Sequence, residues 1–197
     1  MSDQNLSYAP ETTHLLAEGS ALQLFQIAAL LLGNENEAVN LVEETLARVE
    51  TDPCTDGTQA FTEARTLLVR AGVAKMAGQN PAAFHVPVDL PTGDSCIETD
   101  DLQATGLTSE QLAALVSGAG REGLRSWLDR LSPALRAIFV LRAVAGQGGE
   151  QTAESLRQSG GMGAQGWRQD QVSGAYRQAL CSLASSLMSI QTSLLPA

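Results

Sequence analysis

The sequence has few aromatic residues and lacks an apolar run long enough to cross a membrane. Phe, Trp and Tyr make up only 4% of the 197 residues, whereas hydrophobic residues make up 44%. A β-sandwich core needs more aromatic and β-branched side chains, so this composition favours helices that pack through Ala and Leu. No apolar stretch approaches the roughly 18 residues typical of a membrane span. We therefore expect an all-α protein without a membrane partner.

Cysteine is scarce, and so is positive charge near the start of the chain. Cys54, Cys96 and Cys181 lie far apart and match no zinc-binding spacing, so we interpret them as reduced thiols. The first 16 residues include Asp3 and Glu11 but no Lys or Arg, which a secretion signal requires. These features predict a cytoplasmic protein.

The sequence also lacks a recognisable arrangement of catalytic or cofactor-binding side chains. His14 and His85 have no neighbours in the sequence that would make a metal site or a catalytic base. The glycine-rich run at 159–163 lacks the Lys and Ser or Thr of a phosphate-binding loop. No nucleophile is paired with a base. We therefore predict that the protein is not an enzyme and binds no cofactor or metal.

Charge is divided unevenly along the chain, whose net charge is −10. Residues 1–120 hold 17 acidic and 4 basic side chains, which gives the front a charge of −13. Residues 121–197 hold 8 arginines and 5 acidic side chains, which gives the back +3. This asymmetry predicts two modules with different partners.

Apolar spacing divides the chain into two helical modules and a linker. After a polar tail to about residue 18, the first helices are expected at about 20–32, 35–49 and 60–76. Residues 78–106 contain three prolines and five acidic residues but no Lys or Arg, which predicts an acidic linker. The expected units are a helical module at 20–78, a linker with a short helix at 79–120, and a second helical module at 121–190.

The second module has the pattern of a helix-turn-helix. Thr108 and Gln111 predict a capping box before it, and Ser132 with Pro133 predicts a helix start within it. Further helices are expected at about 150–157 and from about residue 167 onward. Three helices with tight breaks fit a motif whose last helix enters the major groove. Helical hairpins that do not touch DNA share this pattern.

The run LDRLSPALRAIFVLRAVAGQ at 128–147 resembles the start of region 4 of sigma-70 family RNA polymerase sigma factors. There a Leu-Pro pair precedes Arg and an apolar Phe-x-Leu-Arg run, and the matching residues are Leu131, Pro133, Arg136, Phe139, Leu141 and Arg142. Residues 172–179 are similar to the family's recognition helix. The resemblance implies that DNA is bound by Arg136, Arg142, Arg168, Gln171, Ser173 and Arg177.

The run LLLGNENEAVNLVEETLARV at 30–49 is similar to region 2 of the extracytoplasmic-function type of these sigma factors. In that region Leu-Gly precedes an acidic helix, and the matching residues are Gly33, Ala38, Leu41, Val42 and Glu44. The family's helix docks on RNA polymerase. The resemblance therefore implies polymerase contacts by Asn40, Leu41, Glu43, Glu44 and Arg48.

These motifs together imply a transcription regulator that binds the RNA polymerase core and helps direct it to promoter DNA. Residues 172–175 read Val-Ser-Gly-Ala, however, where the family usually places Lys or Arg. With so few cations, we expect weak DNA binding by the protein alone. A second interpretation is a sigma-like scaffold that acts as a protein-interaction module, for example with an anti-sigma factor, without reading DNA.

Overall fold

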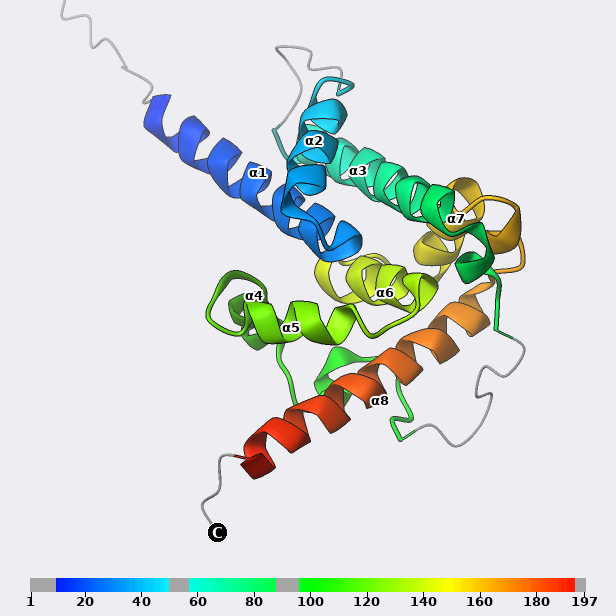
Figure 1. The fold of residues 1–197 in the computed structure, drawn as a ribbon. Coiled ribbons are helices and arrows are strands. Elements are labelled where there is room, and N and C mark those ends of the chain that lie inside the picture. Colours follow the sequence, from blue (N-terminus) through cyan, green and yellow to red (C-terminus); the bar gives the residue numbers. More distant parts are fainter. Residues whose placement is uncertain (1–9, 50–56, 88–95, 194–197) are drawn as a thin grey trace, which may run out of the picture.

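The computed structural model describes residues 10–49, 57–87 and 96–193, and within these ranges it contains helices and no strand (Figure 1). The predicted all-α class is confirmed. The longer elements are α1 (Pro10–Leu32), α2 (Glu35–Leu46), α3 (Gly57–Gln79), α4 (Ser109–Ser117), α5 (Arg121–Leu128), α6 (Pro133–Phe139), α7 (Gly149–Ser159) and α8 (Gln169–Ser193). The short ones are the 3-10 turns η1 (Pro81–Phe84), η2 (Leu102–Thr105) and η4 (Met162–Ala164), and the π-helical turn η3 (Val140–Val144).

Helix starts follow the capping residues that the sequence indicates. The side chain of Ser132 accepts a hydrogen bond from the Leu135 amide at 3.4 Å, and Pro133 occupies the first turn of α6. Thr108 and Gln111 form the predicted capping box of α4, with Thr108 N donating to Gln111 Oε1 at 2.8 Å. These side chains satisfy backbone amides that have no partner within the helix.

Helix lengths differ from the expected ones at three places. α1 begins at Pro10, so the predicted polar tail is wrong for residues 10–18. Proline suits the first helical turn, and Leu, Ala and Glu at 15–18 are good helix formers although the stretch is polar. α2 ends at Leu46 and not near Val49, and α3 extends beyond the expected range to 57–79.

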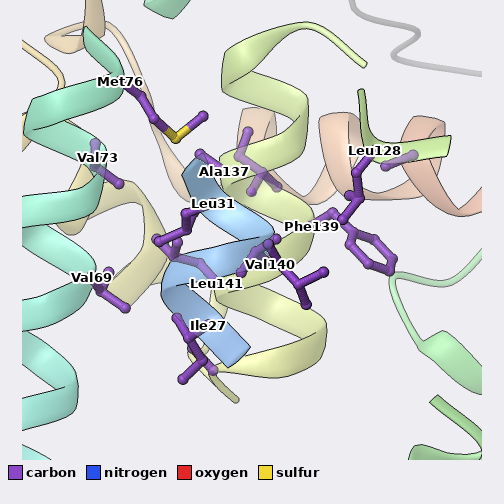
Figure 2. Packing of buried hydrophobic residues seen from close by; sticks show 14 of the residues in the cluster. Ile27, Leu31, Val69, Val73, Met76, Leu128, Ala137, Phe139, Val140 and Leu141 are labelled. Atoms are coloured by element: carbon purple, nitrogen blue, oxygen red, sulfur yellow. The ribbon is translucent and has the colours of Figure 1, made fainter. Parts of the chain in front are cut away.

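Buried residues from the front and back of the chain belong to one hydrophobic cluster. In Figure 2, Ile27 and Leu31 of α1 lie between α3, which carries Val69, and the segment that carries Leu141. Residues 138–141 are all fully buried. Side chains of this size contribute about 1.5–3 kcal/mol each when buried, so this contact is a major part of the core. The division at 20–78, 79–120 and 121–190 stays a prediction.

The described parts of the predicted linker are held against the helices by apolar side chains. Phe84, Ile97 and Leu102 are buried in the common cluster. Trp167 Nε1 donates a hydrogen bond to the Phe84 carbonyl at 2.8 Å, which fixes η1 against the segment before α8. Trp127 is likewise buried, and its Nε1 donates to Ser182 Oγ at 3.1 Å. Both tryptophans therefore anchor the core.

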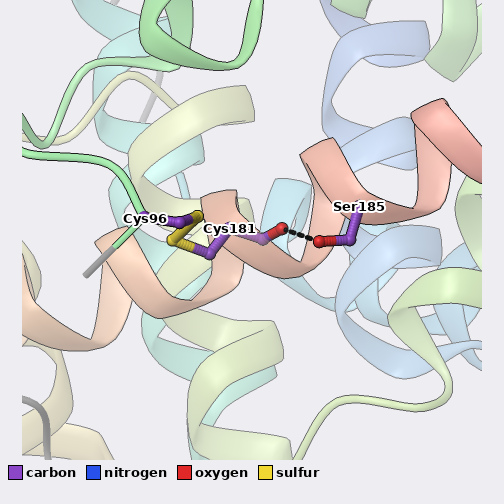
Figure 3. Close-up of a disulfide and its surroundings, with 3 residues drawn as sticks. All are labelled: Cys96, Cys181 and Ser185. Carbon is purple, nitrogen blue, oxygen red and sulfur yellow. Dashed lines mark hydrogen bonds between the residues drawn. A yellow bond between two sulfur atoms is a disulfide. The ribbon is translucent and has the colours of Figure 1, made fainter. Parts of the chain in front are cut away.

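A disulfide joins Cys96, just before η2, to Cys181 in α8 (Figure 3). The two Cα atoms are 5.8 Å apart, although 85 positions separate the residues along the chain. The interpretation of these two cysteines as reduced thiols is therefore wrong. Their spacing in the sequence carried no sign of the pair, because the contact depends on where the segment before η2 lies against α8. Cys54 is outside the described residues.

Candidate nucleic-acid interface

The predicted helix-turn-helix is built from α6 with η3, then α7, and finally α8. α7 and α8 approach closely at Gly149, where an added Cβ would lie 3.1 Å from Gln169 Cγ. The first turn of α8 is capped from within, because the Arg168 amide donates to Gln171 Oε1 at 3.0 Å. Gln171, one of the predicted DNA contacts, thus also fixes the start of the helix.

Residues 172–175 explain part of the departure from the sigma pattern. Val172, Gly174 and Ala175 are buried, and only Ser173 reaches the surface in part. Small side chains at these positions let α8 pack against its neighbours. The surface at the start of α8 is therefore supplied by Ser173 and by arginines from nearby segments.

Four residues of the chain, 98–101, cross this surface and are here called the acidic strap. Its carboxylates are those of Glu98, Asp100 and Asp101. Asp100 Oδ2 accepts hydrogen bonds from Arg142 Nη2 and from Ser173 Oγ, both at 2.9 Å. The Asp100 carbonyl also accepts from Arg142 Nη2, at 3.2 Å. One carboxylate thus brings together two predicted DNA contacts from different helical elements.

Arg177 meets the same strap one turn further along α8. Its Nη1 donates to the Glu98 carbonyl at 3.1 Å. Its Nε is buried and has no hydrogen-bond partner among the described residues, and the same is true of Arg142 Nε. Both guanidiniums therefore keep donors that the strap does not use.

Arg142 also lies over the ring of Tyr176, with its Cζ 5.0 Å from the ring centroid. This contact and the Asp100 ion pair leave only 14% of the Arg142 side chain exposed. Burial raises the pKa of Tyr176 to about 12, with the nearby Arg142 opposing the rise and the carboxylates of Asp101 and Asp100 adding to it. The phenol is therefore neutral at physiological pH, and the positive charge at this place belongs to Arg142.

Arg168 remains open to solvent, with 66% of its side chain exposed. Its Nη2 lies 3.1 Å from Asp170 Oδ2, and the hydrogen bond lowers the pKa of the Asp170 carboxyl. Arg168 and Ser173 border a surface hollow of about 640 Å³, which Glu150, Arg157, Gln169 and Asp170 also line. Its acids and bases are mixed, and no group of three or more potential metal ligands occurs in the described parts of the chain.

Arg136 lies away from the strap, at the junction between the front and back helices. Its Nε donates to the Leu30 carbonyl at 2.7 Å and its Nη1 to Asp129 Oδ1 at 2.9 Å. Burial lowers the pKa of the Arg136 guanidinium, and the charge of Asp129 opposes this shift. Gly33 adopts φ +72° beside it, where an added Cβ would lie 2.8 Å from Arg136 Nη2. The contacts of Arg136 are those of a structural residue.

The predicted polymerase contacts gather on α2 and the turn after it. Asn40, Glu43, Glu44 and Arg48 are exposed, whereas Leu41 is only 4% exposed and packs in the core. Leu41 therefore does not belong to the outer face. Glu43 and Glu44 stand in the last turns of α2, which has no basic residue in its last turn. Acidic side chains at that end face the negative pole of the helix dipole.

Comparisons with protein-family models, with curated proteins and with solved structures gave no match. The resemblance to sigma factors rests on the sequence motifs alone. The geometry described above is therefore the second, independent source for a functional proposal.

The sequence interpretation missed the residues that contact this surface from the linker, Cys96, Glu98 and Asp100. A signal was present, because Ile97 and Leu102 are isolated apolar residues at the borders of an acidic stretch. Both are buried, one on each side of residues 98–101, and they hold these residues against the surface of α8. The contact of Arg142 with the ring of the buried Tyr176 was likewise not predicted.

Proposed function

We propose that this protein is a sigma-factor-like transcription regulator that binds RNA polymerase and helps direct it to promoter DNA. The observation that carries the proposal is the convergence of Arg142 and Ser173 on a single carboxylate, that of Asp100. A guanidinium and a hydroxyl are donors that proteins commonly direct at DNA phosphates. The carboxylate of Asp100 stands where a phosphate oxygen would be received.

The polymerase part of the proposal is supported by the open face of α2. The fold gains little from Glu43 and Glu44, because they lie at the unfavourable end of the helix dipole, and no ion pair joins either to a residue in the described ranges. Two exposed carboxylates that do not stabilise the helix are suited to a basic partner surface. The two weak contacts, with polymerase and with DNA, would strengthen each other through their linkage.

Co-purification from the source cell tests the polymerase contact. We expect the tagged chain to retain RNA polymerase core subunits, and the double variant Glu43→Gln/Glu44→Gln to retain fewer of them. Glu122→Gln, which neutralises an exposed carboxylate on α5, is the matched control and should retain the wild-type amount. Absence of polymerase subunits from the wild-type eluate would contradict the proposal.

Binding to a promoter fragment in the presence of polymerase tests the DNA contact. The double variant Arg168→Ala/Arg177→Ala should lower the affinity, because each lost phosphate contact releases one counterion fewer. Arg130→Ala, an exposed arginine after α5, is the control for general charge. Equal affinity of all three proteins would contradict a DNA contact at α8.

A protein-interaction module without DNA binding is the second candidate, and the acidic strap favours it. The strap already bonds Arg142, Ser173 and Arg177 within the chain. Titration of the whole chain, oxidised and reduced, with duplex DNA separates the two candidates. A steep dependence on salt supports the transcription regulator, and no binding even at low salt supports the interaction module.

A further inference from the structure

The acidic strap is fixed to the protein at both of its ends. On one side Ile97 is buried and the neighbouring Cys96 is covalently bound to Cys181. On the other side Leu102 is buried, and Asp101 caps η2 by accepting from the Gln103 amide at 3.0 Å. These anchors hold the strap against α8 from both ends.

The strap covers a specific part of the proposed interface. It bonds Arg142, Ser173 and Arg177, whereas Arg168 bonds Asp170 outside the strap. Half of the six predicted DNA contacts are therefore engaged by two residues of the strap, Glu98 and Asp100. Its carboxylate and carbonyl oxygens accept the hydrogen bonds that phosphate oxygens would accept.

We propose that the acidic strap is a built-in competitor of DNA, and that the disulfide Cys96–Cys181 keeps it in place. This inference rests on the proposed function and adds its regulation. Cys181 follows Arg177 by four positions in α8, and Cys96 precedes Glu98 by two. The covalent link therefore holds the strap close to Arg177 and raises its effective concentration there.

Reduction of the disulfide removes the covalent link that holds the acidic strap. A dithiol reductant transfers two electrons and two protons to the Cys96–Cys181 bond, which becomes two thiols, while the reductant forms its own disulfide. Cys96 is exposed in the structure, so a reductant reaches it. The strap is then held only by its hydrogen bonds and by Ile97 and Leu102, and phosphate groups compete for Arg142 and Arg177 on more equal terms.

Binding of a 30-base-pair duplex of mixed sequence to the full chain tests the inference. We expect reduction with dithiothreitol to raise the affinity by about tenfold or more, because the tether no longer favours the strap. The double variant Cys96→Ser/Cys181→Ser should bind like the reduced protein whether or not dithiothreitol is present. Equal affinity of oxidised and reduced wild type would overturn the inference and leave the proposed DNA binding intact.

A charge variant tests the strap without changing the disulfide. Oxidised Asp100→Asn should bind the duplex several-fold more tightly than oxidised wild type, because it removes the carboxylate that Arg142 and Ser173 share. Glu122→Gln makes the same change in net charge at an exposed carboxylate on α5, outside the strap. If both variants gained the same affinity for the duplex, the change in net charge alone would explain the gain, and the inference would be overturned.

Amide hydrogen exchange tests the release of the strap without relying on DNA binding, so it distinguishes failure of the inference from failure of the proposed function. Reduction should speed exchange of the Gln103, Ala104 and Gly106 amides, which are hydrogen-bonded around η2, relative to amides within α3. If no form of the protein binds DNA, the proposed DNA contact fails. If exchange is then also unchanged on reduction, the disulfide does not control the strap, and the inference is overturned as well. Faster exchange would show that reduction does release the strap, from a surface that would then serve an anionic partner other than DNA.

Discussion

The outer face of α2 and the start of α8 differ in charge and in how far other parts of the chain cover them. On α2, Glu43 and Glu44 are exposed and extend from a helix that they do not stabilise. On α8, Ser173 and Arg177 are held by the acidic strap, together with Arg142 from η3. The acidic surface is therefore open, whereas the strap covers Arg142, Ser173 and Arg177 and leaves Arg168 open.

Under our proposal, this difference explains how an acidic protein carries a DNA-facing module. Part of the excess negative charge of the front half lies in the linker, where the carboxylate of Asp100 forms an ion pair with Arg142 of the back half. The open surface is available to a partner at all times, whereas the covered one requires a change within the chain. Under our proposal polymerase binding precedes DNA binding for this reason.

The comparison requires that both surfaces belong to one cooperatively folded body, and Trp167→Ala tests this. Trp167 is 1% exposed and bonds η1 through the Phe84 carbonyl. Loss of a buried Trp costs about 3–5 kcal/mol of unfolding free energy. Urea denaturation followed by circular dichroism should show a single transition at a much lower midpoint. Met162→Ala, at a side chain that is 93% exposed, is the control and should change stability by no more than about 0.5 kcal/mol. Two separate transitions would break the comparison.

The loss of stability at alkaline pH tests whether solvent is excluded from the Tyr176 phenol on the covered side of α8. Burial raises the pKa of Tyr176 from 10.0 to about 12. The folded state holds this proton more tightly than the unfolded state, so its stabilisation is complete below pH 10 and is lost as pH rises toward 12. Between pH 9 and 11.5, wild type should lose about 2 kcal/mol more stability than Tyr176→Phe, which has no such proton. Equal losses in the two proteins would show that solvent reaches the phenol.

Two arginine substitutions compare a covered cation with an open one. Arg142→Gln removes the ion pair with Asp100 and the contact with the Tyr176 ring, and should lower the unfolding free energy by about 1–2 kcal/mol. Arg168→Gln removes an exposed pair and should change it by no more than about 0.5 kcal/mol. Both are measured by urea denaturation. The comparison would fail if Arg168→Gln were the more damaging change.

The smallest effect is expected on the open surface, and it has the opposite sign. Glu43→Gln/Glu44→Gln relieves repulsion at the carboxyl end of α2 and should stabilise the protein by about 0.3–1 kcal/mol at low salt. The gain should shrink at high salt, because the charges are exposed. A loss of stability would show that these carboxylates have partners within the chain.

Features that depend on neighbouring residues were predictable from the sequence. The caps at Ser132 and Thr108 and the buried stripe of α8 lie where local spacing indicates, because each needs only contacts within a few turns. The helix at 149–159 was expected at 150–157 for the same reason. The candidate site residues on α8 came from the sigma-like motif, and Gln171, Ser173 and Arg177 occupy positions between its buried residues.

Features that depend on distant residues were not predictable from spacing. The strap on α8 and the disulfide both require the linker to fold back, and nothing at 96–101 itself specifies where it lands. Arg136 shows the same limit in the other direction. Its place in the sigma-like motif suggests DNA, whereas the fold turns it toward the end of α1, where the Leu30 carbonyl accepts its Nε hydrogen.

The bond between Cys96 and Cys181 also keeps the molecule in one piece after a single cleavage in its back half. Because the two cysteines are 85 positions apart in the sequence, α4, α5, α6 and α7 all lie inside a closed covalent ring. A protease that cuts once anywhere inside this ring opens it without releasing a fragment. On a denaturing gel without reductant such a nicked chain still migrates as one molecule, and adding reductant separates it into two pieces. In an oxidising setting the protein thus survives a break that would divide it after reduction.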